Sequence, residues 1–235
     1  MDPTSFRLFM ASASASAEAG VVTSGLVLHL DAGNSSSYGG TGTTWSDLSA
    51  SGNDGTLTNM DATNYSSSDG GYFTFDGVNE YVDVSGSETL TAATFLVWNY
   101  KNGNQGNGTG LIFSRSSIAT GFNFNRNQVG YTWNSASNTY NWQSGLYTPN
   151  YAWFMQAITV TSTSATAYLF TSSATTSATN NVSHSSTTMD AIEVGRDAIG
   201  REFRGNLSVA MIYDRALSST ELTQNFDALK GRYGY

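Results

Sequence analysis

The sequence predicts an all-β protein, a two-sheet antiparallel jelly-roll sandwich with one short C-terminal helix and an N-terminal arm. Charged residues make up 12% of the 235 residues, about half the share usual in globular proteins. Ser, Thr, Asn and Gly take their place, and 13% of residues are aromatic. This composition favours short strands and turns. Apolar runs follow one another without helical segments between them, which excludes an alternating α/β sheet.

Strands are expected where short apolar or alternating runs are bounded by turn residues. The first covers residues 26–30 and the last residues 207–213. Between them we expect strands over residues 72–75, 81–84, 94–100, 111–114, 121–125, 129–133, 153–160, 165–170 and 192–195. The Ser/Thr-rich stretch 171–188 is expected to be a loop or an edge strand.

One helix is predicted over residues 219–230. Ser218 stands three residues before Glu221, the spacing at which each side chain satisfies the other's backbone N–H. Three apolar residues then share one face of the helix: Leu222, Phe226 and Leu229. The helix should therefore lie against the sandwich. Gly231 is expected to end it in the left-handed conformation.

The chain divides into an arm, residues 1–24, and a globular domain, residues 25–235. The arm is rich in Ala and Ser and contains one basic-apolar group: Phe6, Arg7, Leu8, Phe9 and Met10. Three apolar residues after the arginine fall short of the roughly 7–15 that a secretion signal needs. We therefore expect the arm to be retained and to act as an assembly segment that buries its apolar side chains on another subunit.

Several classes of function are disfavoured by composition. The formal net charge is −8 and the ten basic residues are scattered, whereas nucleic-acid binding needs clustered Lys and Arg. The sequence has no apolar run of 18 residues, the length that would predict a membrane-spanning helix. The chain has no cysteine, so thiol chemistry and Cys-ligated zinc are excluded.

Catalysis and cofactors are also not expected. Glycoside hydrolysis needs two carboxyl groups about 5–10 Å apart, and no Asp or Glu lies between Glu88 and Asp190. The Gly-x-Ser-x-Gly pattern of serine hydrolases is absent as well. His29 lies within a predicted strand and is expected to be structural. These observations predict a protein that is not an enzyme.

A turn at residues 47–55 offers oxygen atoms of the kind that calcium prefers. Asp47, Asn53 and Asp54 could supply them. The same residue types commonly cap their own turns by accepting hydrogen bonds from nearby backbone N–H groups. We favour this second interpretation and predict no metal site.

Seven segments, taken in order, carry a family resemblance: GLVLHLD at 25–31, WSDLS at 45–49, GNDGTLTN at 52–59, YFTFDGVNEYVD at 72–83, Trp153, IEVGR at 192–196 and FRGNLSVAMIYDRALSSTEL at 203–222. This ordered set resembles the laminin-G-like, concanavalin A-like jelly-roll family. The resemblance implies a jelly roll and a role in glycan binding, in holding proteins together or in decorating secreted enzymes.

The arm followed by such a domain resembles surface proteins of tailed phages. This resemblance implies a non-enzymatic structural protein on the virion surface, in the capsid or the tail. Its partners would be other virion proteins or copies of itself, with possible adhesion to host glycans. The alternative is a secreted or displayed carbohydrate-binding module.

An aromatic region supplies the ligand-binding candidates. They are Arg126, Tyr131, Trp133, Tyr140 and Trp142, with asparagines between them. Flat aromatic rings and amides suit the apolar faces and hydroxyl edges of sugars. The alternative is that the aromatic residues at alternate strand positions fill the core. Tyr140 and Trp142 lie in a loop-like stretch and are expected to be exposed.

Overall fold

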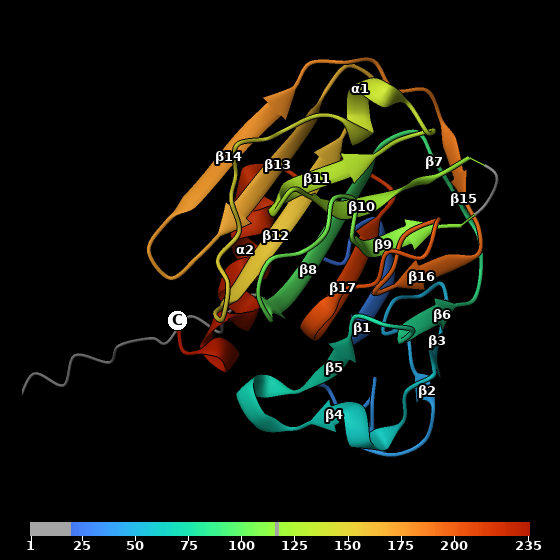
Figure 1. Ribbon diagram of the computed structural model, residues 1–235, viewed down its shortest axis with the longest axis vertical. Coiled ribbons are helices and arrows are strands. Elements are labelled where there is room, and N and C mark those ends of the chain that lie inside the picture. The colour runs from blue at the N-terminus through green and yellow to red at the C-terminus, as the bar shows by residue number, and fades with distance from the viewer. Residues whose placement is uncertain (1–19, 116–117) are drawn as a thin grey trace, which may run out of the picture.

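The computed structural model describes residues 20–115 and 118–235 and confirms the two-sheet sandwich (Figure 1). Sheet A contains β1 (Leu26–Asp31), β4 (Tyr65–Ser66), β5 (Tyr72–Asp76), β8 (Ala93–Lys101), β12 (Trp153–Val160), β13 (Ala165–Phe170), β14 (Thr175–Asn180) and β17 (Arg204–Tyr213). Sheet B contains β2 (Thr44–Trp45), β3 (Gly55–Thr58), β6 (Tyr81–Val84), β9 (Gly110–Ser114), β10 (Thr120–Asn125), β11 (Gln128–Thr132) and β16 (Ile192–Val194). A small ladder pairs β7 (Glu88–Leu90) with β15 (Thr187–Met189).

The strand order of each sheet places distant segments side by side. Sheet A runs β14-β13-β12-β8-β17-β5-β4, with β1 also paired to β17. Sheet B runs β11-β10-β9-β16-β6-β3-β2. The paired strands of the described residues are antiparallel, as the sequence predicts. The Ser/Thr-rich stretch 171–188 contains the edge strand β14 and the short strand β15.

The main hydrophobic core lies between the two sheets. Alternate residues of β8, such as Phe95 and Val97, point into it from sheet A. From sheet B the core receives Phe122 and Phe124 of β10 and Ile112 of β9. Each of these side chains is at most 1% exposed. At about 25 cal/mol per Å² of buried apolar surface, this layer is the main source of stability.

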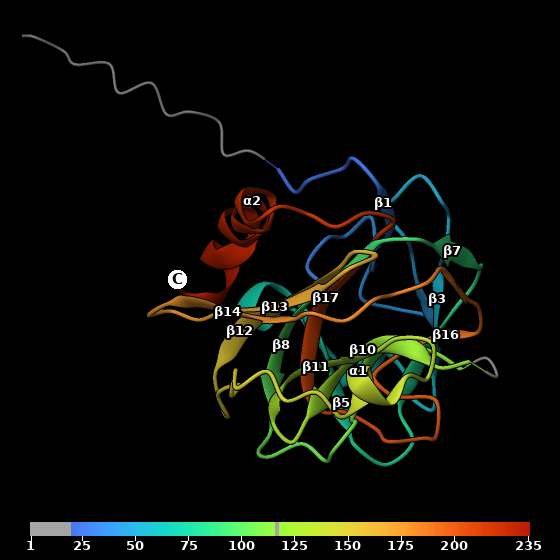
Figure 2. The ribbon, with the colours of Figure 1, turned by 90° about the horizontal axis from the view of Figure 1, so that it is seen from above.

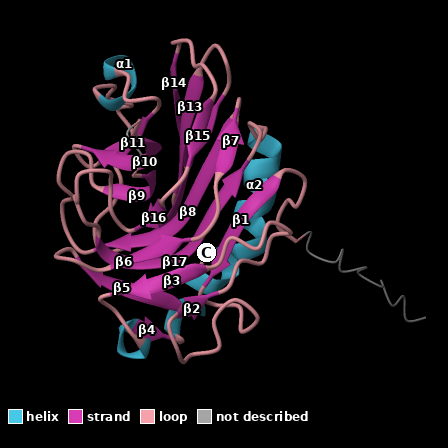
Figure 3. Cartoon of the chain, turned by 90° about the vertical axis from the view of Figure 1, so that its right-hand side faces the viewer, coloured by secondary structure: helices cyan, strands magenta, loops and turns pink. Residues whose placement is uncertain are grey.

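A second hydrophobic layer covers the outer face of sheet A. The helix α2 (Ser219–Leu229) and the 3₁₀ turn η3 (Lys230–Tyr233) lie on the side of sheet A away from β10 and β11 (Figures 2 and 3). Trp98 of β8 stacks on Tyr233 with ring centroids 4.2 Å apart and on Phe226 at 5.4 Å. The central strand β8 of sheet A is therefore buried on both faces.

The predicted capping box of α2 is confirmed. Ser218 Oγ accepts a hydrogen bond from the Glu221 backbone N–H, and the Glu221 carboxylate accepts one from the Ser218 backbone N–H. The Arg215 side chain and the Ser218 backbone hold the pKa of Glu221 at about 2. These partners fix where the helix begins.

The end of the helix differs from the prediction. The chain does not turn at Gly231 but continues into η3, and Gly234 takes the left-handed conformation with φ of 78°. The extra turn places Tyr233 against Trp98, and the Tyr233 hydroxyl donates to Ser208 Oγ at 2.7 Å. Packing on sheet A thus outweighs the local stop signal.

Part of the predicted arm packs on the domain itself. Val22 is buried, its N–H donates to Asn225 Oδ1 at 2.7 Å, and its carbonyl accepts from the Tyr213 hydroxyl. The assembly residues Phe6, Arg7, Leu8, Phe9 and Met10 lie outside the described residues, so that expectation stays a prediction. None of the helices over residues 20–115 and 118–235 is long and apolar enough to span a membrane.

Candidate functional site

The outer face of sheet B carries polar side chains. On β10, Phe122 and Phe124 point into the core, so the alternate residues Asn123 and Asn125 belong to the outer face. The helix α2 lies on the opposite side of the sandwich (Figure 2). This face therefore offers ligand contacts that the helix does not cover.

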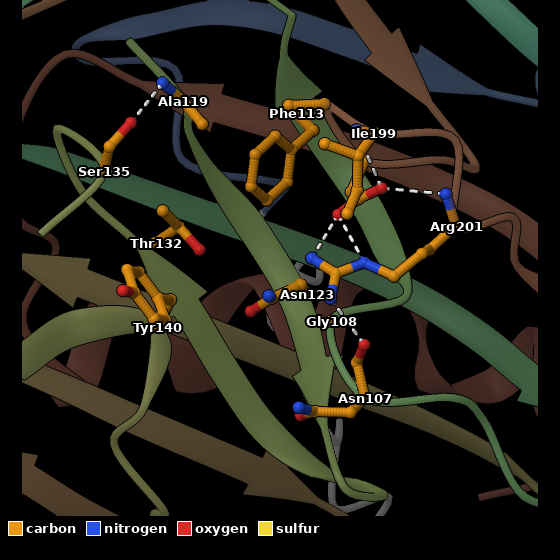
Figure 4. A pocket seen from close by; sticks show the side chains of 12 residues that line it. Asn107, Gly108, Phe113, Ala119, Asn123, Thr132, Ser135, Tyr140, Ile199 and Arg201 are labelled. Atoms are coloured by element: carbon orange, nitrogen blue, oxygen red, sulfur yellow. Dashed lines mark hydrogen bonds and ion pairs between the residues drawn. The ribbon is translucent and has the colours of Figure 1, made fainter. Parts of the chain in front are cut away.

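A pocket of about 290 Å³ opens over strands β9, β10 and β11 (Figure 4). Its lining consists of Asn107, Gly108, Phe113, Ala119, Asn123, Thr132, Ser135, Tyr140, Asp197, Ala198, Ile199 and Arg201. Phe113, Asn123 and Thr132 come from the three strands and form its base. The loop after β11 and the loop after β16 supply opposite walls (Figure 4).

The apolar part of the base is the ring of Phe113. A Cβ atom at Gly121 would lie 2.5 Å from Phe113 Cδ2, closer than any real contact of that kind. The Phe113 ring on β9 can lie across β10 because position 121 of β10 is a glycine. Gly121 thus lets Phe113 form the apolar part of the base, next to the polar residues Asn123 and Thr132.

The polar part of the base is the amide of Asn123. Asn123 is 2% exposed, and its Oδ1 has no hydrogen-bond partner among the residues that the structure describes. A buried polar group without a partner costs about 1–3 kcal/mol. The amide oxygen is therefore available to a ligand that brings its own donors.

One wall contains a turn in an unfavourable backbone conformation. Asn134 and Ser135 both have positive φ, 49° and 54°, where residues other than glycine are strained. The Asn134 amide donates to Ser185 Oγ and Ser186 O at 3.0 and 3.1 Å, which holds the turn. Strain of this kind concentrates at functional sites. The turn leads into α1 (Ser137–Tyr140), which presents Tyr140 with 44% of its surface exposed.

The other wall is organised by Asp197, which is 1% exposed. Its Oδ1 accepts hydrogen bonds from the backbone N–H groups of Ile199 and Arg201 at 3.2 and 2.8 Å. Its Oδ2 accepts from Arg201 Nε at 2.7 Å and also from Arg201 Nη2. The carboxylate thereby fixes both the loop and the guanidinium group.

Of the five sequence-predicted ligand residues, Tyr140 is the one that lines the pocket. Arg126 lies exposed in the turn between β10 and β11 with φ of 54°. Trp142 is partly buried and packs edge-on against Tyr131 at 5.8 Å. The structure therefore does not bring the five together at one accessible surface.

Tyr131 and Trp133 are core residues, each 1% exposed. The Tyr131 hydroxyl pairs with His184 Nε2 at 2.9 Å, and burial raises its pKa to about 12. Trp133 Nε1 donates to Ser185 O at 2.7 Å. The strand alternation turns both rings inward, which agrees with the core-filling alternative for these two residues.

Sequence reasoning missed Phe113, Asp197 and Arg201, and it included Asn123 only among the asparagines between the aromatic residues. The alternation of Phe and Asn over residues 122–125 could have indicated Asn123, because amides occupy the non-core positions of a half-buried strand. No local pattern indicates Asp197 and Arg201, since their role depends on the approach of a loop from β16.

The turn at residues 47–55 caps itself, as favoured from the sequence. Asp47 accepts hydrogen bonds from the backbone N–H groups of His29, Ser49 and Asn53 and from Ser49 Oγ, at 2.6–2.9 Å. The described residues contain no cluster of three or more metal-ligating side chains. His29 is buried, and desolvation lowers its pKa.

No protein-family model and no curated protein matches the chain. Solved structures do share its fold. Domain 4 of AbnA, an extracellular GH43 arabinanase from Geobacillus stearothermophilus in complex with arabinotriose, is 16% identical with a TM-score of 0.59. The match covers 88% of this chain and 100% of that domain.

Two further matches cover parts of larger chains. A Trypanosoma rangeli sialidase is 14% identical with a TM-score of 0.61, over 97% of this chain and 36% of the sialidase. A GH54 α-L-arabinofuranosidase is 9% identical with a TM-score of 0.60, over 90% of this chain and 60% of that one. At these identities the likeness shows the fold alone.

The comparisons correct the expectation of a tailed-phage virion protein. The similar structures come from enzymes named for their action on carbohydrates, and the matches provide no link to a virion. The alternative, a carbohydrate-binding module, stays a prediction. The comparisons do not support the prediction that the chain lacks catalytic activity, and its status as an enzyme stays open to test.

Proposed function

We propose that this chain is a carbohydrate-binding module of the laminin-G-like kind that holds a saccharide in the pocket over β9, β10 and β11. The observation that carries the proposal is the unpartnered amide oxygen of Asn123 at the base of the pocket, near the rings of Phe113 and Tyr140 (Figure 4). An amide bonds to hydroxyl groups through both its oxygen and its NH₂. Aromatic rings contact the apolar C–H faces of a sugar.

The proposal agrees with the fold comparison. A domain of the same fold, matched over its full length, was solved in complex with arabinotriose. Arabino-oligosaccharides are therefore the first ligands to test. We further propose that the chain acts outside the cell, where such polymers are met.

The pocket supports binding better than hydrolysis. Among the described residues that line it, Asp197 is the one carboxylate, and its oxygens are held by Arg201 and two backbone N–H groups. Glycoside hydrolysis needs a second carboxyl group about 5–10 Å away. We therefore expect arabinotriose to be recovered intact after prolonged incubation, and the release of shorter sugars would contradict a binding-only role.

The proposal is tested by Tyr140→Ala in calorimetric titration with arabinotriose and other oligosaccharides. Loss of one aromatic contact is worth about 1–2 kcal/mol, so affinity should fall roughly tenfold. Tyr147→Ala is the matched control, because Tyr147 is 68% exposed and does not line the pocket. Equal affinity in both variants would place the binding site elsewhere, and absence of binding to every saccharide would overturn the function.

A further inference from the structure

Among the described residues that line the pocket, Arg201 is the one cation, and three of the five N–H donors of its guanidinium group are already used. Nε and Nη2 donate to Asp197 Oδ2, and Nη1 donates to the Asn107 backbone carbonyl at 2.7 Å. The group also lies against Gly108, where a Cβ atom would stand 2.1 Å from Arg201 Cζ. Its position is thus fixed on three sides.

This arrangement leaves the described lining of the pocket without a cation that is free of an acidic partner. A sialic or uronic acid presents a carboxylate, which proteins recognise with an arginine fork that is free to donate two parallel hydrogen bonds. Here Asp197 Oδ2 already accepts from Nε and Nη2 of that group and forms an ion pair with it. The net charge of −8 over the whole chain adds repulsion for a further anion.

We infer that the pocket selects uncharged saccharides over acidic ones, and that Asp197 determines this selectivity by occupying Arg201. The inference rests on the proposed carbohydrate-binding function and names the class of sugar. Hydroxyl groups of a neutral sugar bond to the amide oxygen of Asn123 without needing a free cation. Asp197 acts through Arg201 and is a specificity determinant, not a catalytic residue.

The wild-type chain should be tested on a glycan array that carries neutral glycans beside their sialylated or uronic-acid counterparts, with arabinotriose included. We expect neutral members to bind at least about tenfold more tightly. Stronger binding to the acidic members would overturn the inference and leave the carbohydrate-binding function standing. No binding to any glycan would overturn both.

Asp197→Asn tests the role of the carboxylate. The amide keeps an oxygen for the backbone N–H groups but turns an NH₂ toward Arg201, which frees the guanidinium and its charge. Charge-assisted hydrogen bonds contribute about 1.5–3 kcal/mol, so affinity for acidic glycans should rise about tenfold or more. The readout is the ratio of acidic to neutral affinity, which should rise about tenfold or more relative to the wild-type chain.

Asp227→Asn is the matched control, because it removes the same charge from the exposed surface of α2 on the opposite side of the sandwich. A similar gain for acidic glycans in both variants would reduce the effect to overall charge and overturn the role of Asp197. No gain in a folded Asp197→Asn protein, as judged by circular dichroism, would do the same. If that variant does not fold, the wild-type array decides the inference.

Discussion

The outer faces of the two sheets differ in what covers them. On sheet A the outward side chains of β8 are apolar, among them Leu96 and Trp98, and α2 buries them. On sheet B the outward positions of β10 carry Gly121, Asn123 and Asn125, and a pocket opens there. One face thus contributes stability and the other is available for binding. The residue type at the non-core positions of a strand distinguishes the two roles.

The strongest test of this comparison is Trp98→Ala. The ring is fully buried and stacks on Tyr233 and Phe226, so its removal should lower the free energy of unfolding by about 3–5 kcal/mol. Urea denaturation measures the change. Asn123→Ala on the open face should not lower it, because the Asn123 Oδ1 has no hydrogen-bond partner to lose among the described residues. Equal losses in the two variants would mean that the helical layer is not an integral part of the fold.

The fold was predictable because its signals are local. Alternation of apolar residues identifies the long strands, and the pair Ser218 and Glu221 identifies the start of α2. The short strands β2, β3 and β4 were not predicted, since they lie in polar segments that become strands only by pairing with neighbours. Long-range pairing has no local signature.

The pocket was less predictable than the fold. Tyr140 could be proposed from its loop-like surroundings, and Asn123 lies in a visible alternation of Phe and Asn. Asp197 and Arg201 come from a loop that reaches the pocket only because β16 pairs with β9. Tyr131 and Trp133 were predicted as ligand residues but lie in the core. Composition alone does not tell which face of a strand meets the other sheet.

Lys101 is a polar residue at a buried position of sheet A, where the comparison of the two sheets leads us to expect an apolar side chain. Its side chain is fully buried on β8, with Nζ 5.3 Å from the centre of the Phe124 ring and without a hydrogen-bond partner among the described residues. Burial lowers its pKa to about 8. Lys101→Met should therefore raise the free energy of unfolding by about 1–3 kcal/mol at pH 7. Lys230→Met, in the 3₁₀ turn η3 with 39% of its side chain exposed, is the control and should have little effect.

The stability advantage of Lys101→Met over the wild-type chain should depend on pH. At pH values below about 8 the amine is charged in both the folded and the unfolded chain, so the full cost of burial is present. Between pH 8 and about 10.4, the usual pKa of lysine, the unfolded chain binds more protons and the wild-type protein gains stability as pH rises. The advantage of Lys101→Met should shrink over this window. An advantage that is constant from pH 7 to 10 would show that Lys101 is not desolvated.

The smallest expected effect concerns the start of α2. Ser218→Ala removes the hydroxyl that accepts the Glu221 backbone N–H, which should cost about 1 kcal/mol of unfolding free energy. Ser219→Ala, one residue further and exposed, removes a hydroxyl without a capping role and should be neutral. Because α2 covers sheet A alone, neither variant should alter saccharide affinity at the pocket on sheet B. A parallel loss of affinity in Ser218→Ala, measured by calorimetry well below the unfolding temperature, would show that the two faces are coupled through the core.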